Sequence, residues 1–350
     1  MVFLRSKKRN QHKPWTTIIL NIFSRAEGIG LRSGTNLGGQ YFMMTFYVNN
    51  GGYTATDRWV KGCWTCIENP TEDEYRFMLD ELHIPESFIN DIEDNDERPR
   101  REEDDGWHLI IIRAPYRVNT PGAEFATVPV GIVIHDDVCV TVCNYQIDVF
   151  SDFAVYSARK QIRVANPYEL VMRMILSSSV WYLKFLKQIN INMKLVEAEL
   201  QQSVRNKEIL ALQRIENSLV YFLTSIKGNE MLFYRMMHNR QITDMCDSEL
   251  TEDVEIELRQ AEETTNIYRN IIHSMSNSYS SVISNNTNST MQQLTSISII
   301  MMLPTLIASL YGMNVPNYME RNPYAFFYVL GLSVLLGLGM YITFKHRKFF

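Results

Sequence analysis

The apolar, uncharged run of residues 325–344 (AFFYVLGLSVLLGLGMYITF) constrains the fold more than any other feature of the sequence. It matches the roughly 20 residues that a helix needs to cross the hydrocarbon core of a bilayer. A second uncharged segment, residues 294–311 (LTSISIIMMLPTLIASLY), lies just before it. Alone, that segment could be a buried helix of a soluble protein. Beside the first run, it predicts a pair of C-terminal transmembrane helices.

The charges around these segments predict their orientation. Lys345, His346, Arg347 and Lys348 directly follow the second segment, whereas the connecting loop has Arg321 as its one cation. Cationic residues accumulate on the cytoplasmic side of membrane helices. We therefore expect a multi-pass protein of the cell (plasma or inner) membrane, with both termini and the large N-terminal part in the cytoplasm.

Residues 1–42 are an extension of uncertain status. A basic stretch followed by the apolar WTTIILNIF has the order of a signal peptide, which is the alternative interpretation. The apolar part is short and lacks a cleavage site of small residues, so we interpret residues 1–42 as an extension that precedes the first domain, or as sequence upstream of a start at Met43 or Met44.

Hydrophobic periodicity divides the rest of the chain. Short runs of β-branched and aromatic residues, a helix pattern at residues 71–83 and a hairpin turn at residues 135–137 predict an α/β domain. Apolar residues then recur at steps of three and four, which predicts long helices. We expect the following order: an α/β domain (43–165), an antiparallel helical region (166–250), a long stalk helix that becomes the first span (251–311), an external loop (312–324), the second span (325–344) and a basic cytoplasmic tail (345–350).

A polar stripe marks the later half of the long helix. Its members follow one another at steps of four and three, so they share one helix face. They are Asn277, Ser281, Ser284, Asn288, Met291, Thr295, Ser298, Met302, Thr305 and Ser309. A lipid-facing helix would not keep such a stripe, because unpaired polar groups in hydrocarbon cost free energy. A flexible polar linker is the alternative. One stripe cannot enclose a pore, so we predict a homo-oligomeric channel.

Gly312, Met313 and Asn314 follow the first span. Gly312 lets the backbone leave the helix and expose its carbonyl groups. Mg²⁺ prefers oxygen ligands and releases its waters reluctantly, so a ring of Asn314 amides suits its hydration shell. We expect Met313 to pack between neighbouring chains. A simple helix C-cap followed by Pro316 is the alternative.

YGMN after a span that contains proline, followed by a short outer loop, a second span and a basic tail, resembles the CorA-type magnesium/cobalt transporter family. Residues 67–74 (IENPTEDE) and 96–100 (DERPR) lie where that family has similar sequence. The resemblance implies a funnel-shaped, cytosol-heavy homopentamer in which the first span of each protomer lines the pore and the second lies outside it.

The resemblance also assigns roles to particular residues. It implies Gly312, Met313 and Asn314 as the entrance that binds a hydrated cation. It also implies that Asn288, Met291, Leu294 and Met302 line the pore. The stripe itself adds four expected pore-lining residues, Thr295, Ser298, Thr305 and Ser309. The resemblance further implies a regulatory Mg²⁺ between cytosolic domains, bound near Asp91 and Asp253, with Glu255 and Glu257 as substitutes. Glu320 and Arg321 in the loop offset each other, so the sequence leaves transport of Co²⁺, Ni²⁺ or Zn²⁺ open.

Other interpretations carry less weight. Cys63, Cys66, Cys139 and Cys143 could form a zinc site, but all lie in strand-like runs where cysteine behaves as a small buried hydrophobe. The acidic run of residues 91–105 is commonly a solvated face, but a second acidic cluster opens the long helix. Facing carboxylates would repel unless a cation bridges them. The two sequons at residues 285–290 lie on the expected cytoplasmic side, so we discount them.

Several functional classes receive no support. The net charge of −5 gives no reason to expect a nucleic-acid partner. The five cysteines are an odd number in a long chain, which fits a reducing compartment. The sequence contains no P-loop and no GxSxG or HExxH motif, so we do not expect an enzyme. A membrane-anchored binding or signalling protein is the remaining alternative to transport.

Overall fold

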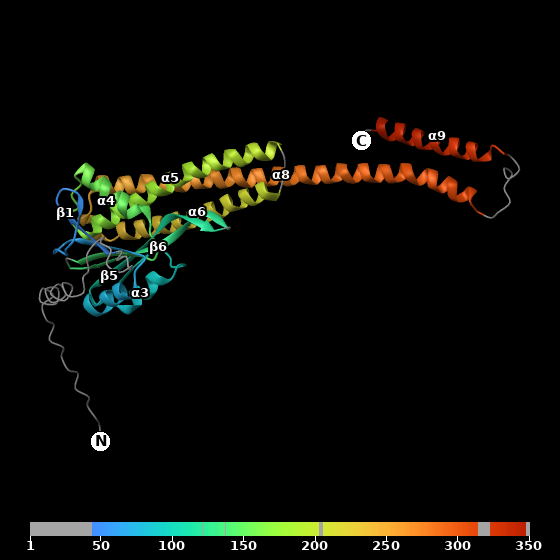
Figure 1. Cartoon of the computed structure of the whole chain (residues 1–350). Coiled ribbons are helices and arrows are strands. Elements are labelled where there is room, and N and C mark those ends of the chain that lie inside the picture. The colour runs from blue at the N-terminus through green and yellow to red at the C-terminus, as the bar shows by residue number, and fades with distance from the viewer. Residues whose placement is uncertain (1–43, 121, 137, 203–205, 314–322, 348–350) are drawn as a thin grey trace, which may run out of the picture. The chain divides into compact units, whose positions relative to one another are not determined.

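The computed structural model describes residues 44–347, apart from residues 121, 137, 203–205 and 314–322 (Figure 1). The N-terminal extension and the residues after Met313 in the outer loop, including Asn314, Glu320 and Arg321, are outside this description. The chain forms two compact units. The first contains the residues up to Glu199 and Asn206–Ile272, and the second contains Leu200–Arg205 and His273–Phe350.

A seven-stranded mixed sheet forms the base of the first unit, with strand order β2-β1-β3-β7-β6-β5-β4. Its strands are β1 (Met44–Asn49), β2 (Tyr53–Thr56), β3 (Trp64–Glu68), β4 (Arg100–Asp104), β5 (Trp107–Thr120), β6 (Ala123–His135) and β7 (Val138–Cys143). The β3–β7 pair is parallel and the other pairs are antiparallel. His135 pairs with Val138, so β6 and β7 form the hairpin that the HDD turn predicted.

Short helices cover one face of this sheet. They are α2 (Glu72–Arg76), the π-helical η1 (Phe77–Glu81) and α3 (Glu86–Glu93). Thr71 and Glu74 form a capping box, because the Thr71 hydroxyl accepts from the Glu74 N–H and the Glu74 carboxylate accepts from the Thr71 N–H. α3 packs into a hydrophobic cluster through Phe88, Ile89 and Ile92. The predicted helix at residues 71–83 therefore begins as expected but continues as a π-helix.

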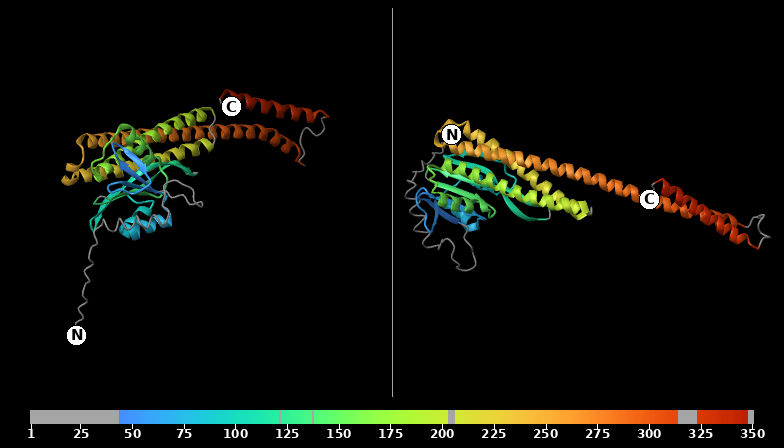
Figure 2. Two further views of the ribbon diagram at one scale, coloured as in Figure 1. Left: turned by 60° about the vertical axis from the view of Figure 1, so that its left-hand side comes forward. Right: turned by 90° about the horizontal axis from the view of Figure 1, so that it is seen from above.

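Longer helices lie on the other side of the sheet (Figures 1 and 2). They are α4 (Asp148–Lys160), α5 (Pro167–Gln202), α6 (Asn206–Met237) and α7 (Arg240–Met245). Phe125 of β6 contacts Phe185 of α5 and Phe222 of α6, which joins both helices to the sheet. Tyr182 and Phe185 of α5 contact Phe222 of α6. The two helices run antiparallel in Figure 1, as the periodicity predicted. The sequence did not predict α4.

A buried polar seam fixes α5 and α6 to β5. The Arg113 N–H donates to Oδ1 of Asn229 in α6 at 2.8 Å, and Nδ2 of Asn229 donates back to the Arg113 carbonyl oxygen at 2.8 Å. The hydroxyl groups of Ser178 and Tyr182 in α5 donate to the same carbonyl oxygen. Asn229 is fully buried. Its side-chain amide therefore supplies hydrogen-bond partners for both the N–H and the C=O of Arg113, as the backbone of a neighbouring strand would.

Two further helices complete the chain. α8 (Ser248–Tyr311) is one continuous helix of 64 residues, as the absence of glycine and proline before Pro304 predicted. α9 (Ala325–His346) follows after the loop. Both contain a stretch long and apolar enough to cross a membrane. The architecture is thus a mixed α/β domain followed by long helices and two candidate membrane helices at the C-terminus, which confirms the predicted fold class.

Candidate ion pathway and regulatory residues

Within the second unit, one face of α8 lies against α9. Ser296 is buried, and Ile299, Ile300, Leu303, Pro304 and Ile307 are partly covered. Pro304 approaches Gly337 of α9, where an added Cβ would lie 3.9 Å from the proline ring. Ala325 and Ser333 of α9 are buried in turn. This apolar face of α8 is therefore the one that supports α9.

The predicted pore-lining residues are all exposed on α8 (Asn288, Met291, Leu294, Thr295, Ser298, Met302, Thr305 and Ser309). Successive residues of an α-helix are about 100° apart. At that spacing, Leu294, Ser298 and Thr305 lie on the opposite side of α8 from Ser296 and Leu303. Asn288 and Thr295 lie at the edge of the exposed face. The stripe is therefore unpartnered within the described chain, while the opposite face carries α9.

Hydroxyl groups of the stripe donate to carbonyl oxygens of their own helix at Ser281, Ser298 and Thr305. The Ser298 hydroxyl donates to the Leu294 carbonyl oxygen at 2.8 Å, and the Thr305 hydroxyl donates to the Met301 carbonyl oxygen at 2.9 Å. These bonds remove much of the free-energy cost of placing serine and threonine in lipid, so the sequence argument overstated that cost. They also leave the hydroxyl oxygens facing outward as acceptors, which suits the hydrogen atoms of a cation's hydration shell.

Of the predicted entrance residues, the structure describes Gly312 and Met313 but not Asn314. α8 ends at Tyr311, and the Gly312 N–H donates to the Ala308 carbonyl oxygen at 2.9 Å. The backbone of Gly312 is outside the left-handed region, so this position does not need glycine for its dihedral angles. Met313 is exposed. Asn314 lies outside the described residues, so its place in the entrance stays a prediction.

The predicted regulatory residues do not converge within one chain. Asp91 of α3 pairs with the Arg100 guanidinium, with Oδ2 2.5 Å from Nη2. Asp253 is exposed on α8. Glu255 accepts hydrogen bonds from Tyr234 and Arg259, and Glu257 is partly exposed. No group of three or more His, Cys, Asp or Glu side chains that could hold a metal ion occurs among the described residues.

The four cysteines of the alternative zinc interpretation are buried and free. Cys63 belongs to the hydrophobic cluster under α3. Burial raises the pKa of the Cys139 and Cys143 thiols to about 12, and burial also raises the pKa of the Cys66 thiol well above its ordinary value. Thiolate is the form that binds zinc, so this environment disfavours a metal site. These side chains pack as small hydrophobes in β3, β7 and the turn before β3.

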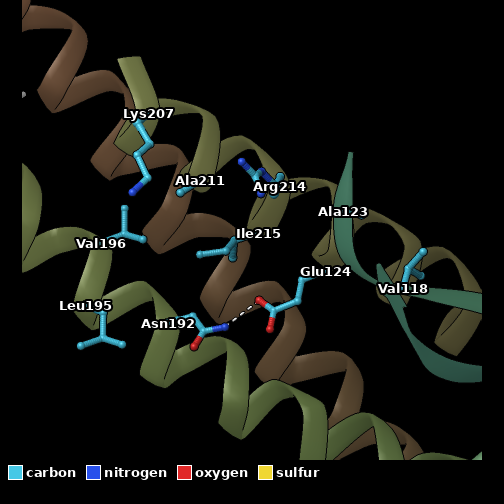
Figure 3. A pocket seen from close by; sticks show the side chains of 10 residues that line it. All are labelled: Val118, Ala123, Glu124, Asn192, Leu195, Val196, Lys207, Ala211, Arg214 and Ile215. Carbon is cyan, nitrogen blue, oxygen red and sulfur yellow. Dashed lines mark hydrogen bonds between the residues drawn. The ribbon is translucent and has the colours of Figure 1, made fainter. Parts of the chain in front are cut away.

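A cavity of about 720 Å³ lies between the far ends of α5 and α6 and the β5–β6 hairpin (Figure 3). Leu195, Val196 and Ile215 supply apolar surface, and Lys207 and Arg214 supply two cations. At one end, Nδ2 of Asn192 donates to Oε2 of Glu124 at 2.6 Å. None of the predicted site residues lines this cavity.

Two contacts in the first unit were not predicted from the sequence. One is the pairing of Arg100 with Asp91, which needs the spatial approach of β4 to α3. The other is the pairing of Asn229 with the β5 backbone. The Gly228-Asn229 dipeptide, which interrupts an otherwise helical pattern, was the available signal for the second.

The α/β domain, the long helix and the paired C-terminal helices together define a membrane protein with a large N-terminal domain. The model of the CorA-like Mg²⁺ transporter protein family matches residues 60–346, which is most of the chain. The chain therefore belongs to this family of divalent-cation transporters.

Two curated relatives share about a quarter of their residues with this chain. The Cobalt/magnesium transport protein CorA of Methanocaldococcus jannaschii is 24% identical over 278 residues, which cover 78% of this chain and 86% of the relative. The Putative metal ion transporter YfjQ of Bacillus subtilis is 24% identical over 296 residues, which cover 82% and 89%.

Solved structures show the same fold over most of the chain. The complete CorA magnesium transporter of Methanocaldococcus jannaschii aligns with a TM-score of 0.71 at 20% identity, covering 87% of this chain and 98% of that chain. Full-length CmaX aligns with a TM-score of 0.61 at 14% identity, covering 88% and 99%. The ZntB cytoplasmic domain of Vibrio parahaemolyticus aligns with a TM-score of 0.54 at 12% identity, covering 71% and 98%.

Proposed function

We propose that this chain assembles as a homopentamer in the cell membrane and conducts Mg²⁺ passively into the cytoplasm. One observation carries the proposal. The face of α8 that points away from α9 is exposed from residue 288 to residue 309 and bears the stripe, with Ser298 and Thr305 opposite α9 and Asn288 and Thr295 at the edge of the face. In an oligomer with α8 at the axis and α9 outside, this face meets its symmetry mates and the pathway, and lipid contacts α9 instead.

The mouth of this pathway is assigned to Gly312, Met313 and Asn314. A ring of neutral amides binds a hydrated dication through its waters, strongly enough for entry and weakly enough for exit. Below the mouth, the Thr305 and Ser298 oxygens continue the series of acceptors. Met302 forms a narrow apolar position between them, and Leu294 and Met291 form further ones beyond Ser298. The cation thus passes without a carboxylate ring that would hold it.

The membrane potential supplies the driving force. The basic tail after α9 supports a cytoplasmic location for both termini. An inside-negative potential favours inward movement by about 2.3 kcal/mol per charge per 100 mV, and a dication experiences twice that.

Regulation is assigned to Mg²⁺ bound between cytosolic domains. Asp91 lies in α3 and Asp253 in α8, and neither belongs to a group of three possible metal ligands among the described residues. The proposed ion therefore lies between Asp91 of one subunit and Asp253 of the next, with Glu255 and Glu257 as neighbouring carboxylates. Their repulsion without the ion loosens the assembly, and the bound ion holds it closed.

Uptake into proteoliposomes tests the transport proposal. An internal fluorescent Mg²⁺ indicator reports influx under an inside-negative potential. We expect potential-dependent uptake by the wild-type protein and its near abolition by Asn314→Ala and Asn288→Ala. Asn286→Ala is the matched control, because Asn286 lies about 160° around α8 from Asn288. Absence of uptake by a folded wild-type oligomer at low internal Mg²⁺ would contradict the proposal and favour an anchored binding protein, which would tolerate Asn314→Ala.

Co²⁺ is a second candidate substrate, because one curated relative is named as a cobalt/magnesium transport protein. Competition of Co²⁺, Ni²⁺ and Zn²⁺ with Mg²⁺ in the same assay ranks the cations. Uptake of Co²⁺ at micromolar concentration that Mg²⁺ fails to inhibit would reassign the principal substrate.

A further inference from the structure

Arg100 occupies the position beside Asp91 that a regulatory cation would need. Its guanidinium contacts three carboxylates at once. Nη2 lies 2.5 Å from Oδ2 of Asp91 in α3, Nε lies 2.8 Å from Oε1 of Glu97, and Nη1 contacts Glu102 in β4. One positive charge therefore serves three negative ones, and two negative charges remain in excess.

The structure holds this arginine in place from several sides. Arg100 is the first residue of β4 and pairs with Ile111 of β5. The preceding Pro99 lies against Gly228 of α6, where an added Cβ would come within 2.8 Å of the proline ring. The Arg113 guanidinium donates to the carbonyl oxygens of Asn95 and Glu97, which anchors the loop between α3 and β4. The backbone around Arg100 is thus fixed before any ion arrives.

The Arg100 cluster is only partly open to solvent. The side chains of Arg100 and Asp91 are 31% and 29% exposed, and that of Glu97 is 20% exposed. Ion pairs at such sites are screened less than those at the open surface. A dication that uses Asp91 must either displace the guanidinium or share the carboxylate with it.

We infer that Arg100 is an internal competitor of the regulatory Mg²⁺ and sets the concentration at which that ion closes the transporter. This inference rests on the proposed regulatory role of Asp91. A guanidinium and a Mg²⁺ ion demand the same carboxylate oxygens, and each weakens the binding of the other. The pairing of Arg100 with Asp91 lowers the affinity of the regulatory site for Mg²⁺. The ion-bridged, closed state therefore forms only when cytoplasmic Mg²⁺ is high.

A purely structural role would give a different result. If Arg100 only fastened α3 to β4, its removal would loosen this part of the domain and weaken Mg²⁺ binding. Competition predicts the opposite direction, because removal frees Asp91, Glu97 and Glu102. The sign of the change in Mg²⁺ affinity therefore separates the two roles.

Limited chymotrypsin digestion measures how Mg²⁺ closes the cytosolic domains without depending on transport. It is done on the full-length oligomer in detergent over a series of MgCl₂ concentrations. We expect the Mg²⁺ midpoint for protection to fall at least about five-fold in Arg100→Gln, within the usual range of coupling between sites. The midpoint of Arg100→Lys should lie between those of the wild type and Arg100→Gln, because lysine keeps the charge but lacks the planar guanidinium that contacts several carboxylates at once. Arg101→Gln is the matched control, because Arg101 contacts Glu103 and His108 instead.

The outcomes separate the two proposals. Protection of the wild type with an unchanged or higher midpoint in both Arg100 variants overturns the inference about Arg100 and leaves the regulatory site standing. Absence of protection in every protein overturns both, while uptake still tests transport. Addition of Asp91→Asn to Arg100→Gln should abolish the five-fold shift, and a shift that persists would show that it does not act through Asp91.

Discussion

Burial changes the ionisation of individual side chains in this protein. Glu230 in α6 is partly buried, and this burial, followed by the nearby Glu262 carboxylate, raises its pKa. Lys227 and Arg259 oppose the shift without cancelling it. A carboxyl group whose pKa is raised on folding destabilises the folded state above that pKa, and the cost disappears as pH falls through it.

Glu230→Gln should therefore raise the thermal unfolding temperature of the detergent-solubilised protein at neutral pH. The amide keeps the shape and removes the disfavoured charge. Near pH 4, where wild-type Glu230 is already protonated in larger part, the gain should shrink. Differential scanning fluorimetry at both pH values measures this, and a gain that stays constant with pH would contradict the electrostatic explanation.

Gly131 of β6 is a second residue whose identity is set by its surroundings. An added Cβ would come within 2.3 Å of the Ile92 side chain of α3. Gly131→Ala should lower the free energy of unfolding by about 1–3 kcal/mol through overpacking. Chemical denaturation measures the loss, which should be smaller when Gly131→Ala is made in an Ile92→Ala background, because that change removes both Cγ1 and Cδ1 of Ile92. An equal loss in the two backgrounds would mean that the strain lies in the backbone and not against Ile92.

At the scale of elements, the seam between α6 and β5 depends on one amide. Asn229→Ala removes both hydrogen bonds to Arg113 and leaves a buried N–H without its partner, which costs about 1–3 kcal/mol. Asn217→Ala on the same helix is the control, because Asn217 donates to the Gly122 carbonyl oxygen at an exposed position. Denaturation should show a clearly larger loss for Asn229. Equal losses would contradict the special role of the seam.

Much of the element order was predictable from the sequence, for physical reasons that differ between segments. The 54 residues from Leu250 to Leu303 lack glycine and proline, so one helix was the simplest outcome. β7 (VCVTVC), residues 128–134 of β6 and residues 109–112 of β5 are nearly continuous apolar runs, as expected of segments buried on both faces of a sheet. By contrast, β4 (RREED) has no apolar residue, and its pairing with β5 rather than its composition makes it a strand.

The candidate sites were predictable to different degrees. Periodicity alone placed the stripe on one face of α8, because helix geometry fixes that relation. It could not show that α9 covers the other face, since this depends on packing between segments. Nor could it show that Arg100 reaches Asp91, because nine residues and a change from helix to strand separate them.

For the whole molecule, the strongest prediction concerns closure by Mg²⁺. The double variant Asp91→Asn, Asp253→Asn should keep uptake at low internal Mg²⁺ and raise it at high internal Mg²⁺, because the two carboxylates proposed to share the closing ion are gone. Flux in proteoliposomes preloaded with different Mg²⁺ concentrations measures this. Inhibition as strong as in the wild type would exclude these two residues as the regulatory ligands.

The uninterrupted course of α8 has a mechanical consequence. The helix rises about 1.5 Å per residue, so the part from Ser248 to Leu303 is a rod about 84 Å long. The two compact units share this one helix, so no loop lies between the residues of the first unit and the stripe of the second. In the proposed transporter, a regulatory signal in the first unit would therefore reach the stripe through hydrogen-bonded helix backbone alone.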